Sequence, residues 1–247
     1  MALPVPAEPS RFCCERIGLQ LDNWQAKFLD SNGRRKALLG SRQCGKSTAV
    51  AALAVHRMMV KADTSVVIVA PSKRQSALLV EKCRWILRKL GLKKLPGDGT
   101  NAHSIRLPNG SAVVGLPCSA PTIRGFTADL LIMDEASWIP DIVYTASRPM
   151  LAATGGELVL MSSANEPTGF FWEVMAHERA DWLQLTVRAS EVTRLDPQFL
   201  KAEREALGED AYAREYECEF GDSVEGVFAR RLVESTLSDA VKPMVFR

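Results

Sequence analysis

The stretch "KALLGSRQCGKST", residues 36–48, decides the fold of this chain. It starts as a short apolar run and continues with the spacing of a phosphate-binding loop, G-x-x-x-x-G-K-S, formed by Gly40, Gly45, Lys46 and Ser47. In such a loop the glycines let backbone N–H groups turn toward phosphate oxygens, the lysine adds a positive charge, and the serine hydroxyl ligates Mg²⁺. An apolar strand precedes the pattern and an amphipathic helix follows it, so the sequence predicts a P-loop and not a glycine-rich surface turn.

ATP and Mg²⁺ are the cofactors that this loop predicts. The residues expected to contact the nucleotide are Gly40, Ser41, Arg42, Gln43, Cys44, Gly45, Lys46, Ser47 and Thr48. Arg42 and Gln43 place a guanidinium and an amide in the middle of the loop, which the phosphate-binding pattern itself does not require.

A second motif, "LLIMDEAS" at 130–137, complements the loop. Asp134 ends an apolar strand, where its carboxylate can hold Mg²⁺ together with Ser47. Glu135 is placed to orient or deprotonate a water molecule for attack on the γ-phosphate. Asp-Glu after one strand could be an ordinary turn, but paired with the loop it predicts hydrolysis. The second carboxylate argues against a small-molecule kinase.

Apolar, β-branched runs alternate with longer helical patterns along the chain. The runs lie at 36–40, 65–70, 128–134 and 156–163, and the helical patterns at 46–61 and 73–90. This alternation predicts an α/β fold with a mostly parallel central sheet flanked by helices, and together with the phosphate-binding loop it indicates the P-loop NTPase (RecA/ASCE-like) class. "SIRLPNGSAVVGLP" predicts two short strands around an Asn109–Gly110 turn, as an insertion at the sheet edge.

The 247 residues suffice for one large domain with a small addition. From about residue 196 the sequence becomes charged and helical, beginning with Asp196 as an N-cap and Pro197 in the first helical turn. We therefore expect an ATPase core over 1–190 and a helical lid and linker over 191–247, with a possible short strand at 226–229.

Composition limits the classes of function. With 47% hydrophobic residues the chain can fill a globular core. Its net charge is only +2, whereas a passive nucleic-acid coat is strongly basic, so any nucleic-acid contact must be local. The six cysteines show no CxxC spacing, so a zinc site is not expected. The sequence has no signal-peptide pattern and no bilayer-spanning apolar run, and we expect an intracellular, soluble protein without a membrane partner.

Three further segments allow two interpretations each. The Gln25 amide could pair with an adenine edge, or Trp24 and Gln25 could belong to a helix that packs on the core; for Trp24 we favour the core. The segment 162–165 could sense the γ-phosphate, or its serines and asparagine could simply start a helix. The basic helix at 81–94 could contact DNA or a neighbouring subunit, or its charges could simply form a solvated face. Its basic residues are Lys82, Arg84, Arg88, Lys89, Lys93 and Lys94. In the turn and helix start after the strand at 65–70, Lys73 and Arg74 could meet a phosphate backbone.

In this order the motifs resemble the ATPase domain of the large terminase subunit, the motor that packages DNA into the capsids of tailed phages and herpesviruses. The resemblance covers about residues 15–225. It rests on "WQ", "GSRQCGKS", "APS", "TIRG" at 122–125, "LLIMDEAS" and "SSAN".

The resemblance implies a role for each matching residue. Gln25 would read adenine, Lys46 and Ser47 would hold phosphate and Mg²⁺, Asp134 the metal, and Glu135 the catalytic water. The coupling segment would be Ser162, Ser163, Ala164 and Asn165. Arg42 would sense the nucleotide and help transmit its state to the grip on DNA, whereas the alternative is a salt bridge that steadies the loop. Arg124 would act in trans on the γ-phosphate of a neighbouring subunit, or form a plain surface ion pair.

The same resemblance implies partners and a location. The partners are double-stranded DNA, a homo-oligomeric, pentameric ring on the capsid portal, and the small terminase subunit, in the cytoplasm of the infected host cell. Family members also carry a nuclease domain, and this sequence stops where that domain would begin, so the domain could have been removed or could lie on another chain. Beyond Asp134 and Glu135 the sequence has no cluster of three acidic residues at predicted strand ends, and we therefore expect no nuclease activity, because two-metal hydrolysis needs such carboxylates.

Two rival functions remain. A helicase shares the glutamine, P-loop, "APS" and Asp-Glu motifs but needs a second RecA-like domain, for which the residues after Gly221 are too few. A nucleotide-dependent interaction module without turnover would not need both Lys46 and Glu135.

Overall fold

The computed structural model describes residues 5–92 and 102–221. Its centre is a seven-stranded sheet in the order β3-β4-β2-β5-β6-β1-β7. The pairing is parallel throughout except between β3 and β4, which run antiparallel. The strands are β1 Arg35–Gly40, β2 Ser65–Ala70, β3 Ser104–Arg106, β4 Ala112–Pro117, β5 Leu130–Asp134, β6 Glu157–Ser162 and β7 Leu183–Val187.

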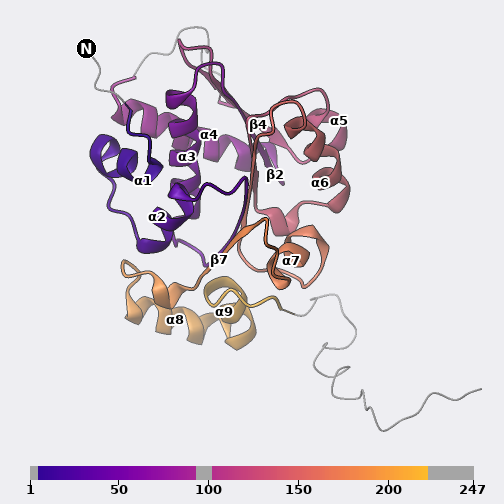
Figure 1. Cartoon of the computed structure of the whole chain (residues 1–247). Coiled ribbons are helices and arrows are strands. Elements are labelled where there is room, and N and C mark those ends of the chain that lie inside the picture. The colour runs from indigo at the N-terminus through magenta and orange to yellow at the C-terminus, as the bar shows by residue number, and fades with distance from the viewer. Residues whose placement is uncertain (1–4, 93–101, 222–247) are drawn as a thin grey trace, which may run out of the picture.

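Helices cover both faces of the sheet (Figure 1). On one face lie α1 Pro9–Phe12, the π-helical turn η1 Cys13–Ile17, α2 Asn23–Asp30, α3 Lys46–Val60 and α4 Lys73–Lys89. On the other lie α5 Ala120–Ile123, α6 Asp141–Ser147 and α7 Gly169–Ala176, with the 3₁₀ turns η2 Ala136–Trp138 and η3 Arg148–Leu151. After β7 come η4 Ala189–Glu191, α8 Pro197–Leu207 and α9 Glu209–Tyr216.

The apolar strands fill two cores, one on each face of the sheet. In β2, Val66 and Ile68 belong to the core under α3 and α4, whereas Val67 and Val69 belong to the core under α5 to α7. A strand buried on both faces needs an unbroken apolar run, because its side chains alternate between the two sides. This explains why these strands lack the alternation of polar and apolar residues.

The predicted fold class is confirmed, and the predicted strands and helices agree with the structure to within about two residues. The two strands around Asn109–Gly110 are present, but β4 is also a full parallel partner of β2, which the turn pattern did not predict. The sequence analysis missed β7, which pairs with β1. The possible strand at 226–229 lies outside the described residues.

The helical pair α8 and α9 lies beyond the C-terminal edge of the sheet, below it in Figure 1. As predicted, Asp196 caps α8, since its carboxylate accepts a hydrogen bond from the backbone N–H of Gln198 at 2.9 Å. Tyr212 and Tyr216 of α9 pack on Ala189 in a small core of their own. The division of the chain at residue 190 stays a prediction. In the described part of the chain, no helix is both long and apolar enough to cross a membrane.

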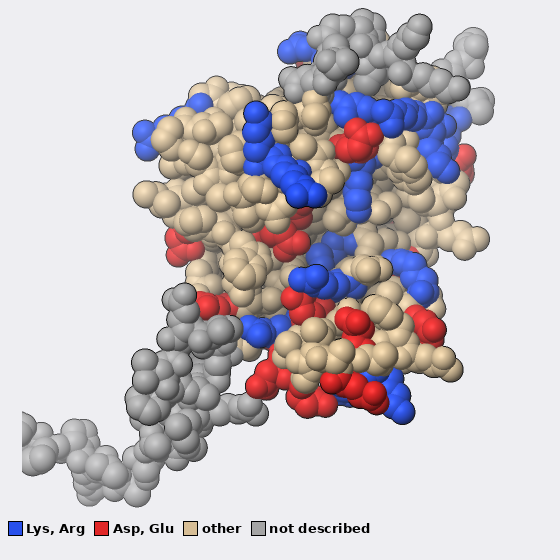
Figure 2. All heavy atoms as spheres, turned by 180° about the vertical axis from the view of Figure 1, so that it is seen from behind, with Lys and Arg blue, Asp and Glu red and all other residues tan. Residues whose placement is uncertain are grey.

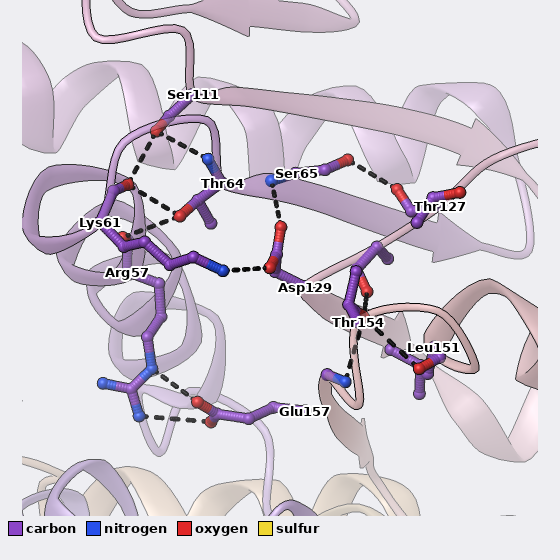
Figure 3. A network of polar contacts seen from close by, with 12 residues as sticks. Arg57, Lys61, Thr64, Ser65, Ser111, Thr127, Asp129, Leu151, Thr154 and Glu157 are labelled. Carbon is purple, nitrogen blue, oxygen red and sulfur yellow. Dashed lines mark hydrogen bonds and ion pairs between the residues drawn. The ribbon is translucent and has the colours of Figure 1, made fainter.

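Ion pairs connect the elements at the N-terminal edge of the sheet (Figure 3). Arg57 of α3 pairs with Glu157 of β6 at 2.7 Å, and Lys61 pairs with Asp129 at 2.7 Å. Asp129 also accepts a hydrogen bond from the backbone N–H of Ser65 at the start of β2. The network ties α3 to β2, β5 and β6 at the edge opposite the P-loop.

Candidate nucleotide site

The predicted motifs meet at the C-terminal edge of the parallel sheet, where ligands bind in open α/β folds. A cavity of about 1140 Å³ lies there, between the sheet edge and α9. Its charged lining consists of Arg42, Lys46, Lys82, Glu135, Arg194, Arg214 and Glu215. Five cations against two carboxylates suit a polyanionic ligand such as a nucleoside triphosphate. In Figure 2, groups of Lys and Arg lie on the upper part and near the centre of this face, whereas Asp and Glu gather along its lower end.

The loop between β1 and α3 has the shape that the glycine spacing predicts. Gly45 has a φ of +98°, and a Cβ added there would lie 2.6 Å from Nη2 of Arg194 and 2.8 Å from Nε2 of Gln25. At Gly40 an added Cβ would lie 2.8 Å from Sγ of Cys44. A side chain therefore fits at neither glycine without displacing its neighbours. Lys46 is the first residue of α3, so the N-terminus of this helix borders the cavity.

Lys46 and the residues around it line the cavity as predicted. Nζ of Lys46 donates to the carbonyl oxygens of Gly40 at 2.5 Å and Ser41 at 2.9 Å, which holds the ammonium over the loop. The other predicted loop residues that line the cavity are Arg42, Gln43, Cys44, Gly45, Ser47 and Thr48. Gly40 and Ser41 lie beneath them and do not line it.

Asp134 and Glu135 lie side by side at the end of β5. The Asp134 carboxylate accepts a hydrogen bond from the backbone N–H of Glu135 at 3.0 Å. Burial and the neighbouring Glu135 charge raise the pKa of Asp134 to about 7, against smaller opposing effects of Lys46 and Lys82. Glu135 itself lines the cavity and adopts a left-handed backbone, with φ of +52°. Asp134 thus lies beneath the cavity wall, and Glu135 faces the space where a nucleotide would bind.

A chain of hydroxyl groups connects Glu135 to the predicted coupling segment. Oγ of Ser162 donates to the Glu135 carboxylate at 3.2 Å. Oγ of Ser137 lies 2.8 Å from both Oγ of Ser162 and the carbonyl oxygen of Ser163. Ser163, Ala164 and Asn165 line the cavity, whereas Ser162 is fully buried behind them. The prediction missed Ser137, which fixes η2 to the end of β6.

Arg42 forms an ion pair with Glu215 of α9. Its guanidinium contacts both carboxylate oxygens, with Nε at 2.6 Å and Nη2 at 3.0 Å. The backbone N–H of Arg42 also donates to the carbonyl oxygen of Glu215 at 2.9 Å. The hydrogen bond to Glu215 raises the pKa of Arg42 further above its usual range. Of the two interpretations of Arg42, the structure contains the ion pair, and the pair joins the P-loop to α9.

Gln25 lies against the loop but not in the cavity. Its Oε1 accepts a hydrogen bond from the backbone N–H of Asp22 at 3.0 Å, which caps α2. Its Nε2 faces Gly45, and the side chain is buried. Trp24 packs against the core, as we favoured. The role of Gln25 toward adenine stays a prediction, with one half of its amide engaged in the helix cap.

Arg124 lies apart from these residues. It follows the short helix α5, it is exposed, and it does not line the cavity. Its predicted trans action requires a second chain and stays a prediction.

The sequence analysis missed four polar residues of the cavity, or did not place them in it. Gln75 and Lys82 come from α4, Arg194 from the loop before α8, and Arg214 from α9. Arg194 donates to Asp22 at 2.6 Å and to the carbonyl oxygen of Cys44, so it lies directly over the P-loop. No motif marks these residues, and only the charged character of α4 and α9 pointed toward them. Within 5–92 and 102–221, no three His, Cys, Asp or Glu residues gather into a group that could hold a metal ion.

Solved structures that share this architecture include one ATPase domain of a large terminase and two large terminases. The ATPase domain from Thermus phage P74-26 superimposes with a TM-score of 0.71 at 21% identity, over 87% of this chain and 100% of that one. The HK97 bacteriophage large terminase gives a TM-score of 0.68 at 16% identity, over 87% and 54%. The large terminase from a thermophilic bacteriophage, in complex with ADP, gives 0.67 at 13% identity, over 81% and 54%. At these identities the likeness shows the fold, a P-loop-like α/β domain, and the chain spans about half the length of the last two proteins.

The family follows from the sequence itself. Residues 37–235 match the family model described as terminase large subunit, T4likevirus-type, N-terminal. The chain belongs to this family, and the resemblance inferred from its motifs is confirmed.

Proposed function

We propose that this chain is the ATP-hydrolysing motor domain of a phage large terminase, which drives double-stranded DNA into a procapsid. One observation carries the proposal: the P-loop, the Asp134–Glu135 pair and the hydroxyl chain to residues 162–165 converge on one cavity with a cationic lining. This arrangement contains what phosphoryl transfer to water needs, namely phosphate binding, a metal ligand and a carboxylate facing the nucleotide. The complex of the thermophilic bacteriophage large terminase with ADP supports the choice of nucleotide.

Lys46 and the loop N–H groups bind the phosphates of ATP in this proposal, with Arg194 above the loop. The residues that would hold Mg²⁺ are Ser47 and Asp134. They fit, because the partly buried Asp134 carboxylate has a raised pKa beside Glu135 and would be stabilised in its charged form by a cation. When bound, Mg²⁺ would neutralise charge that develops on the phosphate oxygens.

Glu135 is the residue that orients the attacking water. It faces the cavity, and Ser162 fixes its carboxylate by a hydrogen bond. A change at Glu135 or at the terminal phosphate then reaches residues 162–165 through Ser162 and Ser137. The ion pair between Arg42 and Glu215 offers a second route, from the P-loop to α9.

DNA contact is assigned to the basic surface of α4. Six of the 17 residues of α4 are Lys or Arg and one is Glu, although the whole chain carries a net charge of only +2. Phosphate backbones bind such clusters without regard to sequence. The remaining proposed partners are further copies of this chain in a pentameric ring, the capsid portal and the small terminase subunit, in the host cytoplasm. In that ring, Arg124 would reach the nucleotide of a neighbouring subunit.

ATPase activity with and without DNA tests the proposal. Lys46→Ala should weaken nucleotide binding, whereas Glu135→Gln should keep binding and abolish turnover, because only the second change spares every phosphate and metal contact. Equal losses of binding in the two variants would contradict the role of Glu135.

The ATPase assay, combined with a duplex-unwinding assay, separates the two alternatives. A helicase-like ATPase would hydrolyse ATP and, in addition, unwind duplex DNA. An interaction module would bind ATP without turnover in the wild type.

A further inference from the structure

Lys82 lies on the face of α4 that borders the nucleotide cavity. Gln75 and Lys82 are seven residues apart, which places them on one side of the helix, and both line the cavity. The adjoining side of α4 is buried against the core through Leu79, Cys83 and Ile86. The helix is therefore fixed by its apolar side, and the position of Lys82 at the cavity follows from that packing.

The charge of Lys82 acts on the catalytic residues. The Lys82 side chain remains exposed to solvent, and its partial burial lowers its pKa below the ordinary value; the Asp134 charge opposes this shift and the Lys46 charge adds to it. The pKa of Asp134 responds in turn to both lysines. Lys82 and Lys46 thus line the same cavity from α4 and the P-loop, and the charges of both act on Asp134 at the end of β5.

Other basic side chains of α4 are engaged elsewhere. Arg84 and Arg88 pair with Glu81, and Lys89 lies over the ring of Trp85 at 5.1 Å from its centroid. Lys82 is the basic residue of this helix that lines the cavity. Its position so near the proposed metal and phosphate sites indicates a role in nucleotide binding, distinct from the DNA contact assigned to the rest of the α4 surface.

We propose that Lys82 is a second lysine of the nucleotide site, which binds the terminal phosphate of ATP from the α4 side while Lys46 binds from the P-loop. The inference rests on the proposed function of the cavity. ADP lacks the phosphate that Lys82 contacts, so Lys82 makes the site prefer ATP over ADP. A point charge on a flexible stem suits this task, since it follows the phosphate without a fixed fork geometry.

Equilibrium binding of ATPγS and ADP, each with Mg²⁺, tests the proposal by isothermal titration calorimetry. Lys82→Ala should weaken ATPγS binding about tenfold or more and change ADP binding less than about twofold, because a charged hydrogen bond to the terminal phosphate is lost. A tenfold loss of affinity corresponds to about 1.4 kcal/mol of binding free energy. Lys82→Arg should retain most of the ATPγS affinity, because it keeps the charge. Lys27→Ala, at an exposed lysine of α2, is the matched control and should change neither affinity.

Two outcomes would overturn the inference. Equal weakening of ATPγS and ADP would indicate a role of Lys82 in the shape of the site, and unchanged binding of both would show that Lys82 does not contact the nucleotide. Lys82→Gln, which keeps the length of the stem, provides the same comparison if Lys82→Ala does not fold. A wild-type protein that binds neither nucleotide would instead refute the proposed function of the cavity as well.

Discussion

Asp134→Asn should stabilise the protein in the absence of nucleotide and metal. The pKa of Asp134 is raised from 3.8 to about 7 by burial and by Glu135, so its ionised form is unfavourable in the folded state. Three pKa units correspond to about 4 kcal/mol, and relaxation of the site reduces this to roughly 2–4 kcal/mol. Asparagine keeps the oxygen that accepts from the N–H of Glu135 and removes the charge.

The sign of the pH dependence follows from proton binding. Between about pH 4 and pH 7 the folded protein binds more protons at Asp134 than the unfolded chain, so the Asp134 contribution to stability falls as pH rises through this window. The advantage of Asp134→Asn should therefore be small near pH 4 and complete near pH 8. Urea unfolding of both proteins at pH 4.5, 6 and 8, in the presence of EDTA, measures this difference.

The control and the functional consequence use the same assay. Asp63→Asn, at an exposed aspartate, should show no such pH-dependent gain. Mg²⁺ with ATPγS should stabilise the wild type and have less effect on Asp134→Asn, because the proposed metal ligand is lost. An Asp134→Asn protein that is less stable than the wild type at pH 8 without metal would refute the argument that the charge of Asp134 is costly.

Lys36→Met should stabilise the fold at pH 7 by about 1–2 kcal/mol, because burial lowers the pKa of Lys36 to about 8. The gain should shrink between pH 8 and pH 10.5, where the wild type itself becomes more stable, and a gain that does not change with pH in urea unfolding would contradict the reasoning. Gly45→Ala should weaken nucleotide binding by tenfold or more, since the added Cβ meets Arg194 and Gln25 at a positive φ; unchanged binding in calorimetry would contradict the loop geometry. Rings mixed from Arg124→Ala and Glu135→Gln chains, each inactive alone, should regain ATPase activity, and mixed rings without activity would exclude the trans assignment. The purified chain should not cut plasmid DNA with Mg²⁺ or Mn²⁺, and reproducible cleavage would overturn this.

The parts of the site predicted from the sequence are those with a fixed local spacing. The P-loop and the Asp134–Glu135 pair each follow an apolar strand, so chain order places both at one edge of the sheet. The sheet was predicted for the same reason, because strands buried on both faces are unbroken apolar runs. β7 was missed because it is short and half-buried, with polar Gln184 and Thr186 among its five residues.

The rest of the site depends on distances in space that no local pattern encodes. Glu215 meets Arg42 across 173 residues, and Arg194 meets Asp22 across 172. Lys82 belongs to a mainly basic segment together with Arg84, Arg88 and Lys89, so composition could not distinguish it from residues on the solvated face. Its position becomes evident only when the packing of Leu79 and Cys83 fixes the rotation of α4.

The connection between Arg42 and Glu215 has more importance for geometry than for stability. The Arg42 side chain is 65% exposed, and an ion pair so open to solvent contributes about 0–1 kcal/mol. The same two residues are also joined by a backbone hydrogen bond, so the contact fixes the position of α9 over the loop in addition to pairing the two charges. Because the pair costs little to break, a nucleotide that attracts Arg42 could release Glu215 without unfolding any core. A contact of this kind is suited to report the state of the loop to α9. The sensing role that the family resemblance implies for Arg42 stays a prediction.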